Sequence, residues 1–222
     1  MSDAVTEALS AARAAHAAAV EALLRAEDAA RASGVEVRLP VIDELTVKRV
    51  NVVEDDGTLR IVIGNSTHGR QIPVRGRLVA HPGRTPSAGL LFVNDEGTEC
   101  GGLEYRGGRG ADGTQQSGYL TVDDYEQNES LRLGMVQAGR SSQKFLEFVD
   151  RPGWSIADVV DGAEPGPGES HTRLRLAREE DGSVGLVLRD GEGRDRLRLV
   201  VPAEGEPVVE VLDGEGVARS LL

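Results

Sequence analysis

The segment Glu99-Cys-Gly-Gly-Leu-Glu-Tyr-Arg places two carboxylates and a phenol on one predicted strand. Side chains alternate between the two faces of a strand, so Glu99 and Tyr105 share one face and Glu104 lies on the other. One carboxylate therefore points inward whichever face is covered. A carboxylate held against apolar strands has a raised pKa and can act as a general acid or base. We predict that Glu99, Glu104 and Tyr105 are catalytic; the alternative is an edge strand with solvated glutamates.

A basic region precedes this strand. No Asp or Glu occurs between Gly57 and Asn94, although acidic residues outnumber basic ones by 37 to 25 in the chain. On a predicted strand over 71–79, Arg75 and Arg77 share one face, where guanidinium groups could bind a carboxylate or phosphate. The alternative is that these arginines pair with acidic residues of the fold. The candidate ligand-binding residues are Arg75, Arg77, Asn65, Phe92 and Tyr119.

Several familiar site motifs are missing from the sequence. The histidines, His16, His68, His81 and His171, have no metal-binding spacing, and a single cysteine excludes an intrachain disulfide or a cysteine cluster. The glycines at 107, 108 and 110 have no accompanying P-loop lysine, so they indicate a hairpin loop. Cys100 has no basic neighbour that would lower its pKa and is interpreted as a structural thiol. The sequence predicts no metal and no cofactor.

Four segments together resemble an uncharacterised bacterial family of β-rich proteins. They are Arg60-Ile-Val-Ile-x-Asn65, Ala88 to Leu103, Tyr125-Glu-Gln127 and Asp150-Arg-Pro152. The string Asn-Asp-Glu-Gly-x-Glu-Cys-Gly-Gly-Leu, at 94–103, is the most specific part, and the resemblance covers residues 42–155. The family has no assigned activity, so the resemblance implies no catalytic residue. At 104–106 this chain is more polar than the family pattern.

An N-terminal helix is predicted over residues 3–33. The segment is Ala-rich, lacks Gly and Pro, and ends at Ser33-Gly34. Apolar residues recur at alternating spacings of four and three, which is a heptad pattern. They are Val5, Leu9, Ala12, His16, Ala19, Leu23 and Ala26, with His16 interpreted as a packing residue. We predict that residues 3–33 either pack on the β region or drive self-association.

From Val35 onward the apolar period changes to two, which is typical of strands. The expected strands lie at 35–39, 45–53, 59–63, 71–79, 88–94, 99–106, 118–122 and 144–149, with a polar stretch at 125–136. A capping box at Asp123 would begin a short helix, and Ser155-x-x-Asp158 has the same signature before residues 156–160. Acidic-Gly turns ending at 182, 193, 205 and 216 separate five further strands that have one apolar and one charged face.

The predicted fold class is mainly β, with an antiparallel barrel or sandwich core. The predicted domain organisation is an N-terminal helix at 1–34, a central antiparallel β domain at 35–162, a linker at 163–170 and a five-stranded β-meander at 171–222. A Gly- and Pro-rich composition marks the linker.

Composition narrows the possible functions. Apolar residues make up 39% of the 222, which is enough for a core. A net charge of −12 opposes binding to nucleic acid or anionic lipid, and one Trp, three Tyr and three Phe leave few residues to stack on bases. The sequence carries no signal segment and no apolar run long enough to span a membrane. We expect a cytoplasmic bacterial protein.

Two functions remain open. In the first, a β-walled pocket binds a small organic molecule, an anion among the candidates, and a cofactor-independent isomerase, cyclase or lyase would use its carboxylates and tyrosines. In the second, the chain is a homo-oligomeric structural or interaction module without catalysis.

Overall fold

The computed structural model describes residues 3–34, 43–69, 71–80, 87–111 and 113–221. These residues form two compact units, Met1–Thr46 and Val47–Leu222. The fold is mainly β with an N-terminal helix, as predicted. The predicted strand at 35–39 lies outside the described residues.

Unit 1 contains the helix α1, Asp3–Ala32. The helix ends where the sequence predicts, because Gly34 adopts a positive φ of 72° and its amide donates to the carbonyl of Arg31. Its apolar residues Val20, Leu23 and Leu24 are exposed. The side chains of Leu9 and His16 are outside the described part of the chain. Neither of the two described helices combines the length and apolar character needed to cross a membrane.

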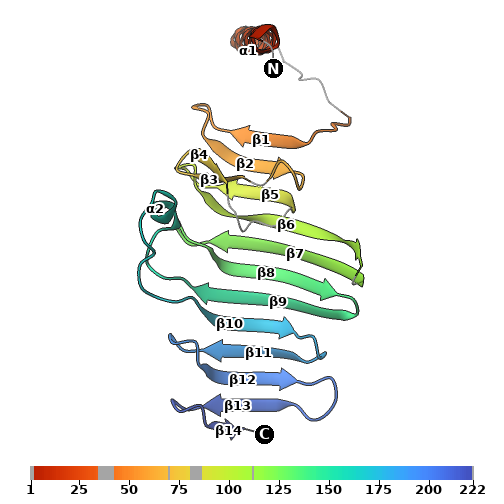
Figure 1. The fold of residues 1–222 in the computed structure, drawn as a ribbon, viewed down its shortest axis with the longest axis vertical. Helices are drawn as coiled ribbons and strands as arrows, with labels where there is room; N and C mark the ends of the chain where they lie inside the picture. Colours follow the sequence, from red (N-terminus) through yellow and green to blue (C-terminus); the bar gives the residue numbers. More distant parts are fainter. Residues whose placement is uncertain (1–2, 35–42, 70, 81–86, 112, 222) are drawn as a thin grey trace. The chain divides into compact units, whose positions relative to one another are not determined.

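Unit 2 is built on one antiparallel sheet of twelve strands in the order β1-β2-β5-β6-β7-β8-β9-β10-β11-β12-β13-β14 (Figure 1). The first six strands are β1 Arg49–Val53, β2 Leu59–Gly64, β5 Ala88–Val93, β6 Glu99–Gly110, β7 Gly113–Asp123 and β8 Glu129–Ala138. The others are β9 Ser141–Asp150, β10 His171–Arg178, β11 Val184–Arg189, β12 Asp195–Val201, β13 Val208–Leu212 and β14 Ala218–Ser220. A two-stranded hairpin, β3 Gln71–Val74 and β4 Arg77–Ala80, and the short helix α2, Ile156–Val160, complete the unit.

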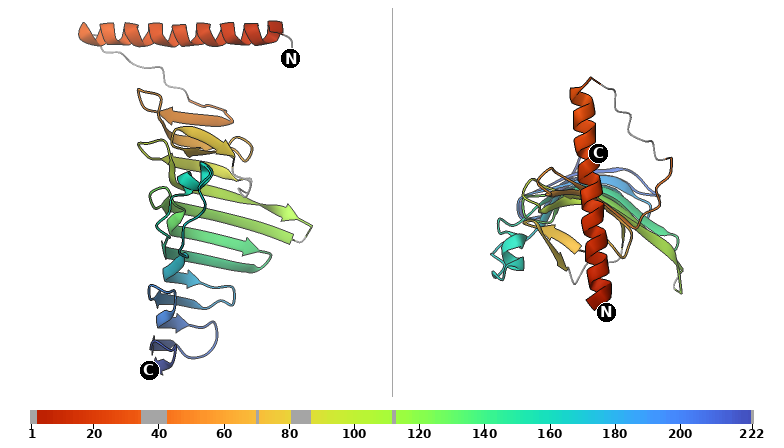
Figure 2. Two further views of the ribbon diagram at one scale, coloured as in Figure 1. Left: turned by 60° about the vertical axis from the view of Figure 1, so that its left-hand side comes forward. Right: turned by 90° about the horizontal axis from the view of Figure 1, so that it is seen from above.

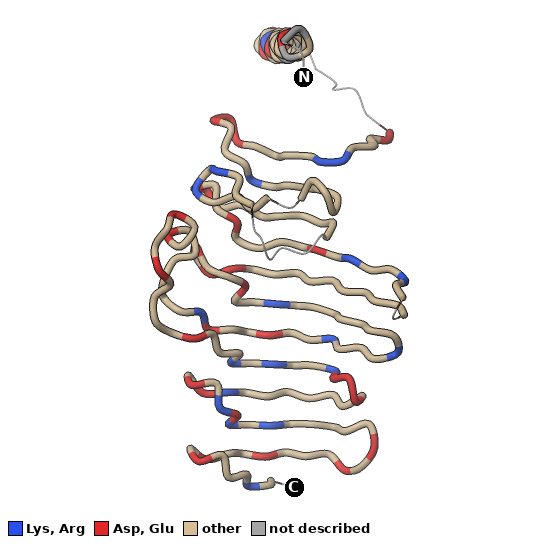
Figure 3. Tube along the Cα trace, in the orientation of Figure 1, with Lys and Arg blue, Asp and Glu red and all other residues tan. Residues whose placement is uncertain are grey.

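The sheet is open, since β1 and β14 form its two edges. The barrel alternative is therefore wrong. The five C-terminal strands occur as predicted, but β9 pairs with β10, so the sheet runs through the predicted boundary at 163–170 without interruption. Acidic residues gather at the turns of these C-terminal hairpins (Figure 3).

One face of the sheet carries two parallel rows of apolar side chains, and we call it the leucine face. Strand register defines both rows, because directly paired residues lie on the same face. The first row is Val50, Ile63, Leu90, Leu103, Leu120, Leu133, Leu146, Leu176, Leu186, Leu199 and Val209. The second is Val52, Ile61, Phe92, Gly101, Val122, Leu131, Phe148, Leu174, Leu188, Leu197, Val211 and Arg219.

We call the opposite face the covered face. Part of it is overlaid by the β3–β4 hairpin and by α2, which lie on the same side of the sheet (Figure 2). The buried apolar residues of this face include Val62 and Leu91, which are neighbours in one row. Further along the sheet the row becomes charged, and Glu147 lies between Arg132 and Arg175 with an ion pair to each. Glu147 is only 4% exposed, so the two guanidinium groups offset the cost of burying its charge.

Candidate functional site

A groove of about 610 Å³ lies on the covered face. Its floor is formed by β6 to β8, its first wall by the β3 residues Ile72 to Val74, and its second wall by 126–129 and 154–159. Polar floor residues are Glu99, Glu104, Tyr119, Thr121 and Arg132. Ligand pockets of drug-sized molecules have volumes of roughly 300–1,000 Å³, so the groove is of a suitable size.

A β-bulge brings both predicted carboxylates to this groove. Phe92 pairs with Gly101, but the next residue, Val93, pairs with Glu99, so Cys100 is the extra residue on β6. The bulge requires glycine at 101, because φ there is +128° and a Cβ would lie 2.4 Å from the carbonyl oxygen of Thr121. The extra residue shifts the alternation by one. The prediction that Glu99 and Glu104 lie on opposite faces is therefore wrong.

Glu104 has a fixed position in the groove. It is half-buried, it pairs in register with Tyr119, and its Oε2 accepts a hydrogen bond of 2.7 Å from Ser87 Oγ. Tyr119 is fixed in turn, because its ring and that of Phe145 lie on either side of Gly134, with 6.2 Å between the ring centroids. A Cβ at Gly134 would come within 2.8 Å of both rings. The aromatic side chain beside Glu104 is thus held by packing.

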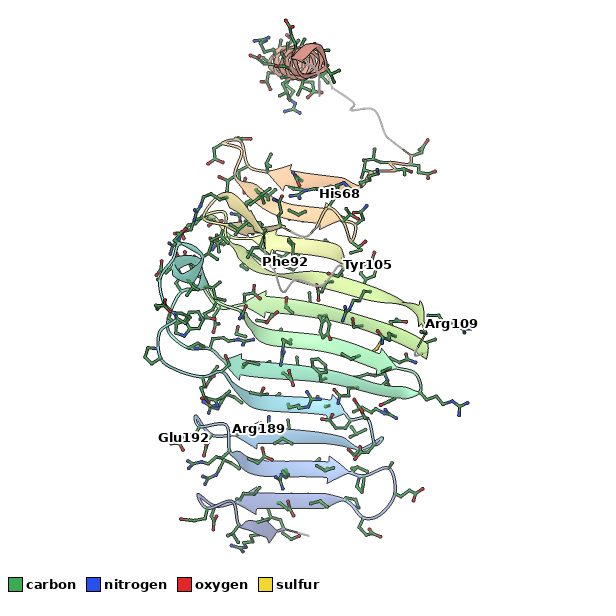
Figure 4. The ribbon with its side chains drawn as sticks, viewed as in Figure 1. His68, Phe92, Tyr105, Arg109, Arg189 and Glu192 are labelled. Carbon is green, nitrogen blue, oxygen red and sulfur yellow. The ribbon has the colours of Figure 1, made fainter. Side chains whose placement is uncertain are left out.

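The structure separates the other predicted site residues from the groove. Tyr105 lies on the leucine face and is exposed, and Phe92 belongs to the second row of that face (Figure 4). Asn65 follows β2, where its Oδ1 accepts hydrogen bonds from the amides of Thr67 and His68. Asn65 therefore orders a turn.

Arg75 lies in the turn of the β3–β4 hairpin and Arg77 begins β4, so the two arginines do not share a face of one long strand. Arg75 and Gly76 form a two-residue turn in which both residues have positive φ, 46° and 74°. The Arg75 amide donates to Thr98 Oγ1 at 2.9 Å, and the Gly76 amide donates to the carbonyl of Gly97 at 3.1 Å. These two bonds attach the tip of the hairpin to the β5–β6 turn.

The Arg75 side chain joins the two walls of the groove. Its Nε and Nη2 donate to the two carboxylate oxygens of Glu126, both at 2.6 Å, and Nη2 is 2.8 Å from Asp158. Glu126 also accepts a bond of 2.5 Å from Ser155 Oγ, the N-cap of α2. The Arg75 guanidinium lowers the pKa of the Glu126 carboxyl, and the Ser155 bond acts in the same direction against burial. Arg77 pairs with Asp161.

These contacts match the alternative interpretation of the basic region, in which its arginines pair with acidic residues of the fold. Arg60 follows the same pattern, with ion pairs to Glu54 and Asp95. Arg70, His81 and Arg84, which also belong to the basic region, lie outside the described residues. No described arginine of this region lines the groove.

Sequence reasoning missed several polar residues of the groove, among them Thr121, Glu126, Arg132 and Trp154. Tyr125-Glu-Gln127 was part of the family resemblance, and this was the only signal that pointed to Glu126. Arg132 Nε and Trp154 Nε1 are buried, and neither has a hydrogen-bond partner within the described part of the chain. Unpaired buried donors are costly, so each nitrogen favours an acceptor that the described side chains and backbone do not supply.

Two further kinds of site were considered among the described residues, a metal site and a reactive thiol at Cys100. No group of three His, Cys, Asp or Glu side chains among them is placed to hold a metal ion. Burial raises the pKa of the Cys100 thiol, with the Asp123 charge acting in the same direction. The thiolate form is thus disfavoured, as expected of a structural thiol.

Comparison of the chain with family models, with curated proteins and with solved structures finds no match.

Proposed function

We propose that the groove binds a small organic molecule that donates hydrogen bonds, such as an amine or a polyol. The observation that carries this proposal is the bulge at Cys100, which directs Glu99 and Glu104 to the same groove. A carboxylate accepts hydrogen bonds through two oxygens, so two of them favour hydroxyl or ammonium groups. A strand with regular alternation would present only one.

The charges around the groove favour a donor ligand over an anion. Among the described residues that line the groove, carboxylates outnumber guanidinium groups; Arg132 is the one arginine among them and is itself paired with Glu147. The lining carboxylates are those of Glu99, Glu104, Asp123, Glu126 and Glu129, of which Glu126 is paired with Arg75 and Glu129 with Arg151. An anionic ligand would approach against this field, whereas a cation would be attracted. Arg132 Nε and Trp154 Nε1 would then bind a neutral acceptor atom of the same ligand.

Cofactor-free proton transfer is the chemistry that this groove supports. Glu104 and Tyr119 are neighbours in register, so a carboxylate and a phenol face the same bound molecule. Such a pair serves isomerases, cyclases and lyases that move a proton without a cofactor. Catalysis of this class extends the binding proposal and depends on it.

A thermal-shift screen with defined compounds tests the binding proposal. Choline, spermidine, glucose and glucosamine represent donor ligands, and citrate and inorganic phosphate represent anions. We expect at least one donor compound to raise the Tm of the full chain, because a ligand that binds only the folded state stabilises it. Glu104→Gln should abolish that rise, whereas Tyr105→Phe on the opposite face should preserve it. Stabilisation by the anions alone would contradict the proposal.

Self-association through residues 3–33 is the second candidate function, and the exposed apolar side chains of α1 favour it. Val20, Leu23 and Leu24 are each between 43% and 59% exposed. Substituting Leu23→Lys and Leu24→Lys in the full chain should lower the mass measured by light scattering at least twofold. An unchanged mass would reject self-association through this helix.

A further inference from the structure

We propose that the leucine face binds the leucine face of a second copy of this chain. This proposal concerns the opposite side of the sheet from the groove and does not depend on the groove. It rests on the two apolar rows, which run across the sheet from β1 to β13 in the first row and to β14 in the second.

Both rows contain exposed apolar residues, which are spread along the sheet from β1 to β13. Six of the nine members of the first row from β2 to β12 remain exposed by 39% to 52%. They are Ile63, Leu103, Leu120, Leu133, Leu176 and Leu199. Four members of the second row, Val52, Val122, Phe148 and Val211, are exposed to a similar degree. Exposed apolar patches on monomers seldom exceed about 300–600 Å², and larger ones mark interaction surfaces.

The area of this face is sufficient for a stable dimer. Together the two rows expose on the order of 1,000 Å² of apolar surface per copy, whereas a standard interface buries about 800 Å² per partner. Most sheets bury one face against a second layer, and the described residues of Val47–Leu222 supply no such layer over the leucine face. A second copy supplies that layer and completes a sandwich of two sheets about 10 Å apart.

The repeat of the rows selects another copy of this chain as the partner. Each row has one residue per strand, with a glycine only at position 101, so the apolar ridges repeat at the strand spacing of about 4.8 Å. A second copy presents the same spacing over the same number of strands, and a two-fold axis brings identical patches together. A partner without this repeat would match the face over a few strands only.

The residues of the two rows add no charge repulsion to the contact. The chain has a net charge of −12, and two copies therefore repel one another at long range. The two rows nevertheless contain no acidic residue, and Arg219, at the β14 edge, is their single charged member. Anionic lipid would be repelled by the negative net charge of the protein, and a lipid surface has no apolar ridges at the strand spacing to compensate for that repulsion.

Light scattering on full-chain variants tests the proposal. The background protein carries Leu23→Lys and Leu24→Lys, which removes any association through α1. We expect this protein to have twice the chain mass of 23.6 kDa at 10–200 µM, and Leu133→Lys to reduce the mass to that of one chain. Val136→Lys is the matched control, because Val136 lies on the same strand but on the covered face. It should leave the mass unchanged.

Three results would overturn the proposal. The first is a background protein that stays at the mass of one chain up to 200 µM. The second is an equal loss of mass with Val136→Lys and Leu133→Lys. The third is binding of the monomeric background protein to phosphatidylcholine vesicles through the leucine face, which would assign the face to lipid.

Footprinting provides an independent readout if Leu133→Lys fails to fold. Hydroxyl-radical labelling of the background protein modifies exposed leucines in proportion to their accessibility. Leu103, Leu120, Leu133 and Leu176 should lose at least half of their labelling between dilute and concentrated samples. Labelling that does not change with concentration would contradict the proposal.

Discussion

Arg75 and Glu126 connect backbone conformation with the position of the groove walls. They are the two non-glycine residues with positive φ among the residues that the structure describes, and their side chains bind each other. L-residues seldom adopt this conformation, and surrounding contacts must stabilise it where it occurs. Here the bidentate ion pair, Ser155 and the Thr98 hydroxyl supply those contacts. The pair therefore stabilises both walls together.

We predict that Glu126→Gln lowers the free energy of unfolding by about 1–3 kcal/mol, because hydrogen bonds to a charged, buried group are lost. The side chain of Glu126 is only 4% exposed. Urea denaturation followed by circular dichroism measures the change. Glu192→Gln is the control, since Glu192 forms an exposed ion pair with Arg194 and should change stability by less than about 0.5 kcal/mol. Equal effects of the two substitutions would contradict the role of Glu126.

The contribution of Glu126 to the free energy of unfolding should decrease as the pH falls. The folded protein lowers the pKa of this carboxyl below its ordinary value of 4.5, mainly through the bond from Arg75. A group with a lowered folded pKa stabilises the protein above the unfolded pKa, and the stabilisation is lost as pH falls through the folded pKa. The stability gap between wild type and Glu126→Gln should be complete at pH 7 and narrow below pH 4.5. Urea titrations at pH 7, 5, 4 and 3 measure it; a gap that widens in acid would refute this assignment.

At the scale of elements, the β6 bulge decides which side chains meet in the groove. Period-two patterns predicted most strands of the sheet, because alternating apolar residues mark the strands and turn residues mark their ends. They did not predict the bulge, because two adjacent glycines are compatible both with a bulge and with a regular strand. The turn at Arg75–Gly76 was missed for a related reason. Arginine is unusual in a turn that requires two positive φ values, and its stabilising partner, Glu126, is distant in the sequence.

We predict that Gly101→Ala destabilises the protein by at least about 2 kcal/mol, because a positive φ and the carbonyl of Thr121 leave no room for a Cβ. Gly108→Ala is the matched control on the same strand. A Cβ there would meet nothing within 4 Å, so little change is expected. Thermal melts of both variants in the full chain make the comparison. Similar melting temperatures would show that the bulge does not require glycine.

At the scale of the whole sheet, we assign ligand binding to the covered face and association with a second copy to the leucine face. The covered face carries the groove and the charged row, and the two rows of the leucine face contain no charged residue from β1 to β13. The sequence predicted this division for the five C-terminal strands, where arginines alternate with leucines. It did not predict that the division continues through β5 to β9, because glycines, tyrosines and glutamines interrupt the alternation there. The alternation of apolar residues also did not predict whether the sheet closes into a barrel. Closure depends on whether the first and last strands pair with each other.

The placement of Glu104 in a ligand-binding groove is the central claim, and calorimetry tests it most directly. The measurement is the Kd of the full chain for the donor compound that most raises the Tm, compared among wild type, Glu104→Gln and Tyr105→Phe. Loss of a charged acceptor should raise the Kd at least tenfold, equivalent to about 1.4 kcal/mol. Tyr105→Phe, one residue along β6 but on the leucine face, should stay within about twofold of wild type, well under that tenfold step. An unchanged Kd for Glu104→Gln, or an equal loss for Tyr105→Phe, would contradict the account.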